Sequence, residues 1–92
     1  MTDKVTVKIV DGTHIRNTMD VDFCMASHGY YSDYIPKGEI WVDKSVPVAE
    51  RPCLIAHEKF ERSLMKRGMK YLEAHAKASV IERKCRAKRK NS

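Results

Sequence analysis

The chain has 92 residues, of which 42% are hydrophobic and 33% charged, and its net charge is +6. These values are typical of one small globular domain with a modest core, and they exclude a largely disordered chain. No apolar run approaches the roughly 18 residues of a membrane-spanning helix, and the N-terminus lacks the apolar segment of a secretory signal, so we expect a cytoplasmic protein with no membrane segment.

The first half of the chain carries strand and turn signals. Residues 5–10 (VTVKIV) alternate β-branched and polar side chains, which is the period of a half-buried strand. Asp11-Gly12 is a turn signal, and residues 13–23 are expected to return as a partner strand. Residues 24–34 are rich in turn residues and read as a loop, and residues 38–43 (GEIWVD) form a third short strand. The prediction is a small antiparallel sheet of about three strands.

The second half of the chain is helical. A first helix begins near residue 46, with Ser45 as N-cap and Pro47 in the first turn, or alternatively at Pro52. It ends before Gly68, which can take the left-handed conformation beyond a helix. A second helix follows from about residue 70 to the basic end of the chain. Because the linker is short, the two helices should pack as a hairpin, and the fold class is α+β.

The net positive charge belongs to the C-terminus. Residues 1–82 contain 12 basic and 12 acidic side chains, so they form a neutral domain, and residues 83–92 form a basic tail. The basic residues of the tail are Arg83, Lys84, Arg86, Lys88, Arg89 and Lys90. Such a tail can bind nucleic acid or another acidic partner, or it can be a solvated helix end whose cations complement the helix dipole.

The three cysteines, Cys24, Cys53 and Cys85, are widely spaced and form no CxxC pair. An odd number at such spacing argues against a disulfide framework and against a thiolate zinc site. We therefore expect free thiols in a reducing compartment.

Ionisable side chains fall on the apolar face of the first helix. At about 100° per residue, His57, Glu58 and Glu61 lie in or beside the stripe that Leu54 and Met65 mark. Burying two carboxylates close together is costly without a compensating cation, shared proton, metal ion or water-filled cleft. These residues therefore indicate a site.

The second helix repeats this pattern. Tyr71, His75, Ala78 and Glu82 follow one another at spacings of four, three and four, which places them on one helix face. If the two helices pack through these faces, the imidazoles and carboxylates of both can meet at one point.

This set of side chains has the chemistry of a zinc site. Zinc takes imidazole nitrogen and carboxylate oxygen in a roughly tetrahedral shell. His57 and Glu61 lie one turn apart and can bind one ion, with His75 as the best available third ligand. Glu58 is the residue directly after the ligand His57, so it can accept a proton from a water molecule at the metal rather than bind the metal itself. Glu82 is either a fourth ligand or the residue that orients an imidazole.

The segment IWVD, followed after a gap by LIAHEKFE, resembles the edge strand and active-site helix of minimal zincin metallopeptidases. HEKFE followed by GMKYLEAH and a later Glu is similar to small bacterial and phage proteins with an HExxE…AH pattern, and the resemblance covers residues 39–82. It implies that His57 and Glu61 bind zinc and that Glu58 is the general base. The chain departs from zincins at Glu61, where they have a second His, and the added negative charge makes the metal a weaker Lewis acid.

Other interpretations of the sequence stay open. The polar cluster can be purely structural in a non-enzymatic binding module whose basic tail engages nucleic acid or an acidic partner, or zinc can be bound without catalysis. Tyr71 is a core or rim residue, or a donor to the transition state. If the zincin comparison holds, the strand around Trp41 can pair with an extended peptide. His14 and His28 have no partner at a helical spacing, and no role is predicted for them.

Overall fold

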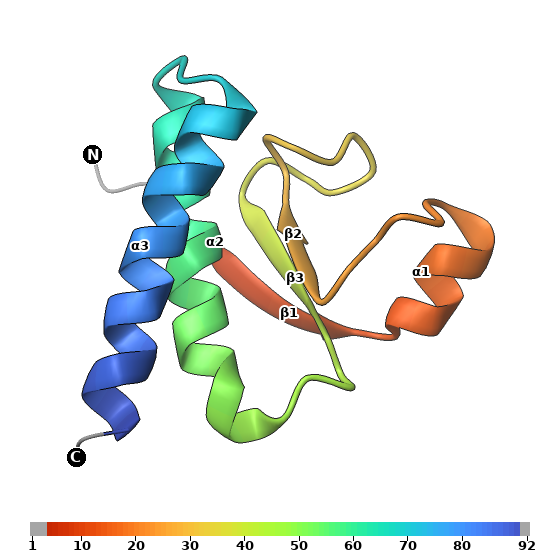
Figure 1. Cartoon of the computed structure of the whole chain (residues 1–92). Coiled ribbons are helices and arrows are strands. Elements are labelled where there is room, and N and C mark those ends of the chain that lie inside the picture. The colour runs from red at the N-terminus through yellow and green to blue at the C-terminus, as the bar shows by residue number, and fades with distance from the viewer. Residues whose placement is uncertain (1–3, 91–92) are drawn as a thin grey trace.

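The computed structural model describes residues 4–90 of the chain (Figure 1). In chain order the elements are β1 (Thr6–Val10), α1 (Gly12–Thr18), β2 (Ala26–His28), β3 (Glu39–Asp43), the 3₁₀ helix η1 (Val48–Glu50), α2 (Arg51–Lys66) and α3 (Tyr71–Lys90).

The three strands form one sheet in the order β1-β3-β2. Figure 1 shows α2 and α3 side by side as a hairpin, with the sheet next to them and α1 at the far end of the molecule. The predicted α+β class, the three-stranded sheet and the helical hairpin are therefore confirmed. The sheet is mixed rather than purely antiparallel, because β1 pairs with β3 in parallel and only β2 pairs with it antiparallel.

The parallel pairing arises because α1 replaces the expected return strand. Asp11 does not start a hairpin turn: its Oδ1 accepts hydrogen bonds from the N–H groups of Thr13 (3.1 Å) and His14 (3.2 Å), which makes it the N-cap of a helix. Residues 13–18 are thus helical, and the chain re-enters the sheet first as β2 at the opposite edge and then as β3, which lies between β2 and β1. The prediction of a partner strand over residues 13–23 was wrong for this reason.

Asp43, at the end of β3, holds α1 in place. Its Oδ1 accepts a hydrogen bond from the backbone N–H of Gly12 at 3.2 Å. The backbone at position 12 lies so close to this carboxylate that a Cβ there would collide with it. Its Oδ2 lies 3.4 Å from the guanidinium of Arg16. A glycine is therefore required at position 12 because of the close contact with Asp43, and not because of a hairpin turn.

The apolar core lies between β3 and α2. Ile40, Val42, Val46 and Leu54 form a buried cluster against which Val5, Val7, Ala26 and Ile55 pack. Complete burial of such a side chain stabilises a fold by about 1.5–3 kcal/mol. This core fixes the face that α2 turns toward the sheet, and it leaves the next turns of α2 to carry polar groups.

The end of α2 follows the sequence prediction. Gly68 adopts a φ of 101°, its N–H donates to the carbonyl of Met65, and the N–H of Met69 donates to the carbonyl of Leu64. This is the Schellman arrangement, which satisfies the last carbonyls of a helix. After this tight turn α3 runs antiparallel to α2 and continues to residue 90. Residues 83–90 are therefore the last turns of α3.

The cysteine prediction was wrong for two of the three residues. Cys53 of α2 and Cys85 of α3 form a disulfide with a Cα–Cα distance of 5.5 Å, and Cys24 is a free, exposed thiol. The antiparallel hairpin brings these positions together although 32 residues separate them in sequence.

The strand around Trp41 does not lie at an edge of the sheet. Trp41 lies in β3, the central strand, which has partners on both sides, so this strand cannot pair with a peptide as an edge strand would.

Among residues 4–90, no helix combines the length and the apolar character needed to cross a bilayer.

Candidate metal centre

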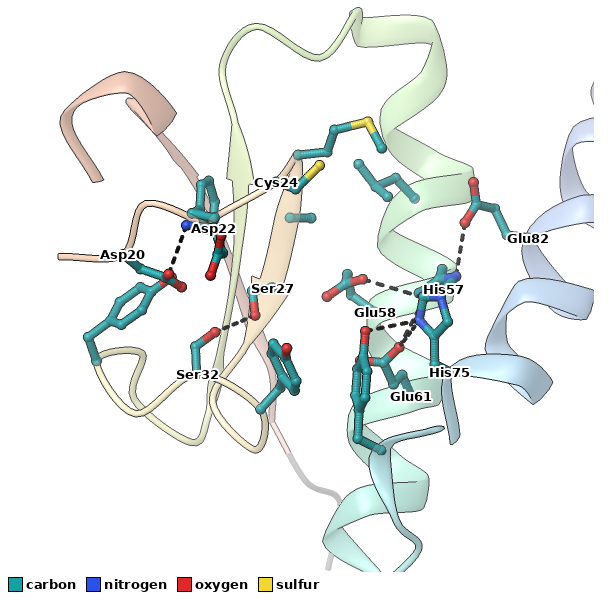
Figure 2. A pocket seen from close by; sticks show the side chains of 17 residues that line it. Asp20, Asp22, Cys24, Ser27, Ser32, His57, Glu58, Glu61, His75 and Glu82 are labelled. Atoms are coloured by element: carbon teal, nitrogen blue, oxygen red, sulfur yellow. Dashed lines mark hydrogen bonds and ion pairs between the residues drawn. The ribbon is translucent and has the colours of Figure 1, made fainter. Parts of the chain in front are cut away.

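The ionisable residues of α2 and α3 meet beside the sheet, as Figure 2 shows. His57, Glu58 and Glu61 of α2 are buried, with exposed fractions of 4%, 6% and 3%. His75 and Glu82 approach them from α3. The five residues singled out in the sequence therefore come together at one place. This happens because positions four and seven residues apart on each helix share the face through which the helices pack.

Glu61 is the centre of this cluster. Its Oε2 lies 3.1 Å from Nε2 of His57 and 2.9 Å from Nδ1 of His75, and its Oε1 lies 2.8 Å from Nε2 of His28. Burial alone would raise the pKa of this carboxyl, but the hydrogen bonds from His28, His57 and His75 outweigh it and lower the pKa to about 2. Glu61 is therefore ionised at neutral pH and attracts positive charge.

His57 has an unusual pair of neighbours. Its Nε2 faces Glu61, and its Nδ1 lies 2.9 Å from Oε1 of Glu82 without the direction of a hydrogen bond. Nδ1 is therefore a buried polar atom with no hydrogen bond to any residue in the range 4–90. The hydrogen bond to Glu61 raises the pKa of His57, aided by the charges of Glu58 and Glu82, although burial opposes the rise. A neutral ring carries a proton on only one nitrogen, so one contact to a carboxylate is left uncompensated unless the ring is protonated or a cation binds at Nε2.

Glu58 is the least compensated acid of the site. Its Oε2 lies 3.7 Å from Nε2 of His57, and its side chain makes no hydrogen bond to another residue in the described part of the chain. Burial, with the charge of Glu61 as a second cause, raises the pKa of Glu58 to about 8. Without a bound cation this carboxyl therefore holds a proton at neutral pH.

His28 is the member that the sequence interpretation missed. It ends β2, is fully buried, and its Nδ1 accepts the backbone N–H of Tyr30 at 3.1 Å. Its Nε2 must then carry the proton in the neutral ring and donate it to Glu61. No spacing in the sequence could reveal this contact, since the two residues are 33 positions apart and β2 is only three residues long.

The donor atoms of His57, Glu61 and His75 fit a zinc ion. All three lie within 4.8 Å of one another. Two zinc–ligand bonds of about 2.0–2.1 Å at the tetrahedral angle place the donor atoms about 3.3 Å apart. The distances from Oε2 of Glu61 to His57 and His75, 3.1 and 2.9 Å, are close to that value. A metal at Nε2 of His57 would also leave the proton on Nδ1, beside Glu82, which is the arrangement of many zinc-bound histidines.

A second group, His28, Glu58 and Glu61, also has donor atoms within 4.8 Å of one another. The hydrogen bond from the N–H of Tyr30 argues against a metal there. An imidazole that binds a metal through Nε2 carries its proton on Nδ1, and this proton would point at the Tyr30 N–H. His28 therefore orients Glu61 rather than binding a metal.

Glu82 is held from both sides. Its Oε1 faces His57, and its Oε2 accepts a hydrogen bond from the guanidinium of Arg86 at 2.9 Å. The same guanidinium also forms an ion pair with Glu50 at 3.3 Å. Arg86, which the sequence placed in the basic tail, thus supports the site instead of facing a partner. The side chains of Arg83, Lys84, Lys88 and Arg89 are exposed on α3, and the side chain of Lys90 lies outside the described residues.

Tyr71 lies at the edge of the site. Its hydroxyl is 3.5 Å from Nδ1 of His75, and its ring packs 4.2 Å from that of Tyr31, measured between centroids. A pocket of about 250 Å³ opens next to these rings and next to Glu58 and Glu61. The candidate metal centre is therefore accessible to a small ligand or to one side chain of a larger one.

No family model, curated protein or solved structure matches this chain. The resemblance to zincins thus rests on the sequence pattern of this chain alone.

Proposed function

We propose that this protein binds one zinc ion through His57, Glu61 and His75 and hydrolyses peptide bonds in the manner of a minimal zincin. The observation that carries the proposal is the setting of His57. Its Nε2 points at Glu61 beside His75, while its Nδ1 is buried next to Glu82 without a hydrogen bond. A cation bound at Nε2 leaves the proton on Nδ1, so that this N–H lies beside the carboxylate of Glu82.

In this scheme the chain supplies the groups that move protons. When bound, zinc supplies a Lewis acid that polarises a carbonyl and makes water more acidic. Glu58 takes the proton of the attacking water on its carboxylate and returns it to the leaving amine. The pKa near 8 in the absence of metal matches this role, because a nearby cation lowers that pKa and leaves a base poised near neutral pH. The hydroxyl of Tyr71 is placed to donate to an oxygen at the edge of the site.

Glu61 in place of a second His affects the two halves of the proposal differently. Its negative charge favours retention of a cation, but it lowers the Lewis acidity of that cation. Zinc binding is therefore the half that the geometry supports most directly, and peptide hydrolysis depends in addition on Glu58. A zinc-binding protein without catalysis remains the closest alternative.

The catalytic half is tested with Glu58→Gln, which keeps the shape of the side chain and removes the base. We expect this variant to retain zinc with an affinity within about threefold of the wild type, because Glu58 is not a ligand. Hydrolysis of a fluorescence-quenched peptide mixture should fall by about 10²-fold or more. Hydrolysis at the wild-type rate in the variant would remove Glu58 from the mechanism, and a zinc-loaded wild type that cleaves no peptide would leave a binding protein.

A second candidate function is a non-enzymatic module whose polar cluster is structural and whose basic α3 end binds nucleic acid. It is favoured by the fact that Glu61 is satisfied by three imidazoles even without a metal. DNA affinity that falls steeply with salt, in a protein that carries no metal, would support it.

The cytoplasmic location also stays a prediction. The Cys53–Cys85 disulfide weighs against it, because such bonds persist mainly in oxidising compartments.

A further inference from the structure

The pocket beside the candidate metal centre has a second wall that the proposed chemistry does not use. One wall carries Glu58 and Glu61 of α2, and the opposite wall is built from the segment between α1 and β3, including Asp20 and Asp22 (Figure 2). A sphere of the pocket's volume, about 250 Å³, is about 8 Å across. This space suits one long side chain rather than several residues of a peptide.

The lining of this pocket has a charge opposite to that of the whole chain. Five acidic side chains line it, and no Lys or Arg is among the lining residues, although the chain has 18 basic residues and a net charge of +6. These acids are Asp20, Asp22, Glu58, Glu61 and Glu82, of which Glu58 holds a proton at neutral pH when no cation is bound. A bound zinc ion would offset the charge at the α2 wall, but it would leave the charge of Asp20 and Asp22 on the opposite wall.

Acceptor oxygens in the pocket are open to a ligand on both walls. Asp20 is held in position, since its Oδ2 accepts the hydroxyl of Tyr34 and its Oδ1 accepts the N–H of Asp22, each at 3.0 Å. The exposed Asp22 carboxylate has no hydrogen bond or ion pair with another residue in the range 4–90. On the other wall Glu58, only 6% exposed, likewise makes no hydrogen bond to a described residue. A buried acid such as Glu58 calls for a hydrogen-bond partner or a cation.

Aromatic rings complete the pocket. Tyr31, Tyr34 and Tyr71 all line it, and the rings of Tyr31 and Tyr71 pack against each other at its edge. Aromatic faces accommodate both the methylene stem of a long side chain and a cation placed over the ring. Carboxylates combined with tyrosine rings are therefore complementary to an amino or guanidino group on a flexible stem.

We infer that this pocket binds a lysine or arginine side chain of a peptide, with Asp20 and Asp22 as the groups that select the positive charge. That this peptide is the substrate rests on the proposed function; binding of the basic side chain does not. The carboxylates of Asp20 and Asp22 then determine the specificity for a basic side chain, whereas the residues of α2 and α3 are those of the proposed hydrolysis.

The test compares two peptides that differ by one charged group: acetyl-Ala-Lys-Ala-amide and acetyl-Ala-norleucine-Ala-amide. Their dissociation constants are measured by NMR titration of the full chain, both zinc-free and zinc-loaded. We expect the lysine peptide to bind about tenfold more tightly, since one aromatic-lined, partly exposed charge pair is worth a factor of this order. Asp22→Asn should reduce this preference about threefold. The matched control Asp33→Asn, an exposed position outside the pocket lining, should leave it unchanged.

The outcomes separate this inference from the proposed function. Equal affinity for the two peptides, a preference that Asp22→Asn does not reduce, or the absence of shifts at pocket residues would each overturn the inference, even in a protein that binds zinc. A lysine preference that depends on Asp22 in a protein that binds no zinc would support the pocket and overturn the zinc site.

Discussion

At the scale of single residues, the tautomer of His28 decides how Glu61 is presented. The N–H of Tyr30 occupies Nδ1, so Nε2–H is directed at Oε1 of Glu61 and leaves Oε2 for His57 and His75. One carboxylate oxygen is thus held by His28, and in the proposed metal centre the other is available to the cation. Partners of this kind typically change metal affinity by 10–100-fold when they are removed.

This division predicts graded effects at position 28. His28→Phe removes the donor and should weaken zinc binding by about tenfold or more. His28→Gln keeps an N–H near the position of Nε2 and should recover part of that loss. Isothermal titration of zinc into both variants measures the difference. Wild-type affinity in His28→Phe would show that Glu61 does not depend on this histidine.

Asp43 is the second residue with a defined electrostatic role. Burial would raise its pKa, but hydrogen bonds from the N–H groups of Ser45 and Gly12, together with Arg16, more than offset this and lower the pKa below its usual value. A lowered folded-state pKa means that the contribution to stability is complete above the unfolded-state pKa of about 4 and is lost as pH falls through the folded-state value.

We therefore expect Asp43→Asn to destabilise the protein at pH 6 by about 1–3 kcal/mol and to matter progressively less toward pH 2. Denaturant unfolding of both proteins across this range gives the difference. Because other acids titrate in both proteins, the difference between the two curves is the relevant quantity. A difference that is constant with pH would contradict the role assigned to the ionised carboxylate.

At the scale of elements, the site depends on how α3 is held against α2. The disulfide between Cys53 and Cys85 joins the two helices next to the turn that carries Glu82, and the Schellman turn at Gly68 joins them at the other end. His75 and Glu82 lie between these two connections. The register of the hairpin is thus fixed at both ends of the candidate metal centre.

Removal of the disulfide should therefore loosen the site as well as the fold. Closing a loop of 32 residues contributes about 3–4 kcal/mol in the chain-entropy account. The double variant Cys53→Ser/Cys85→Ser should lose about this much stability in denaturant unfolding and should also bind zinc more weakly. Cys24→Ser is the matched control and should behave as the wild type. Equal stability of the double variant and the wild type would argue against the disulfide.

At the scale of the whole molecule, the sequence predicts what depends on local periodicity. The α+β class, both long helices, the Gly68 turn and the inward faces that carry the ionisable residues all follow from the spacing of side chains along the chain. The strand around Trp41 was also predicted, although its place at the centre of the sheet was not.

The features that could not be predicted depend on contacts between distant segments or on ambiguous signals. Asp11-Gly12 is compatible with both a hairpin turn and a helix N-cap, and the contact with Asp43 selects the second. The strand β2 has only three residues and lies in a turn-rich segment, so neither it nor His28 shows a period. The pairing of Cys53 with Cys85 depends on the packing register of two helices, which the sequence alone does not specify.

The measurement that tests the central claim most directly is the metal content of the protein, purified without a chelator or a His-tag. We predict about one zinc ion per chain in the wild type and in His14→Ala, whose histidine is exposed on α1, and its loss in His57→Ala. A wild-type protein that carries no zinc and gains no thermal stability when zinc is added would contradict the account, as would undiminished zinc binding in His57→Ala.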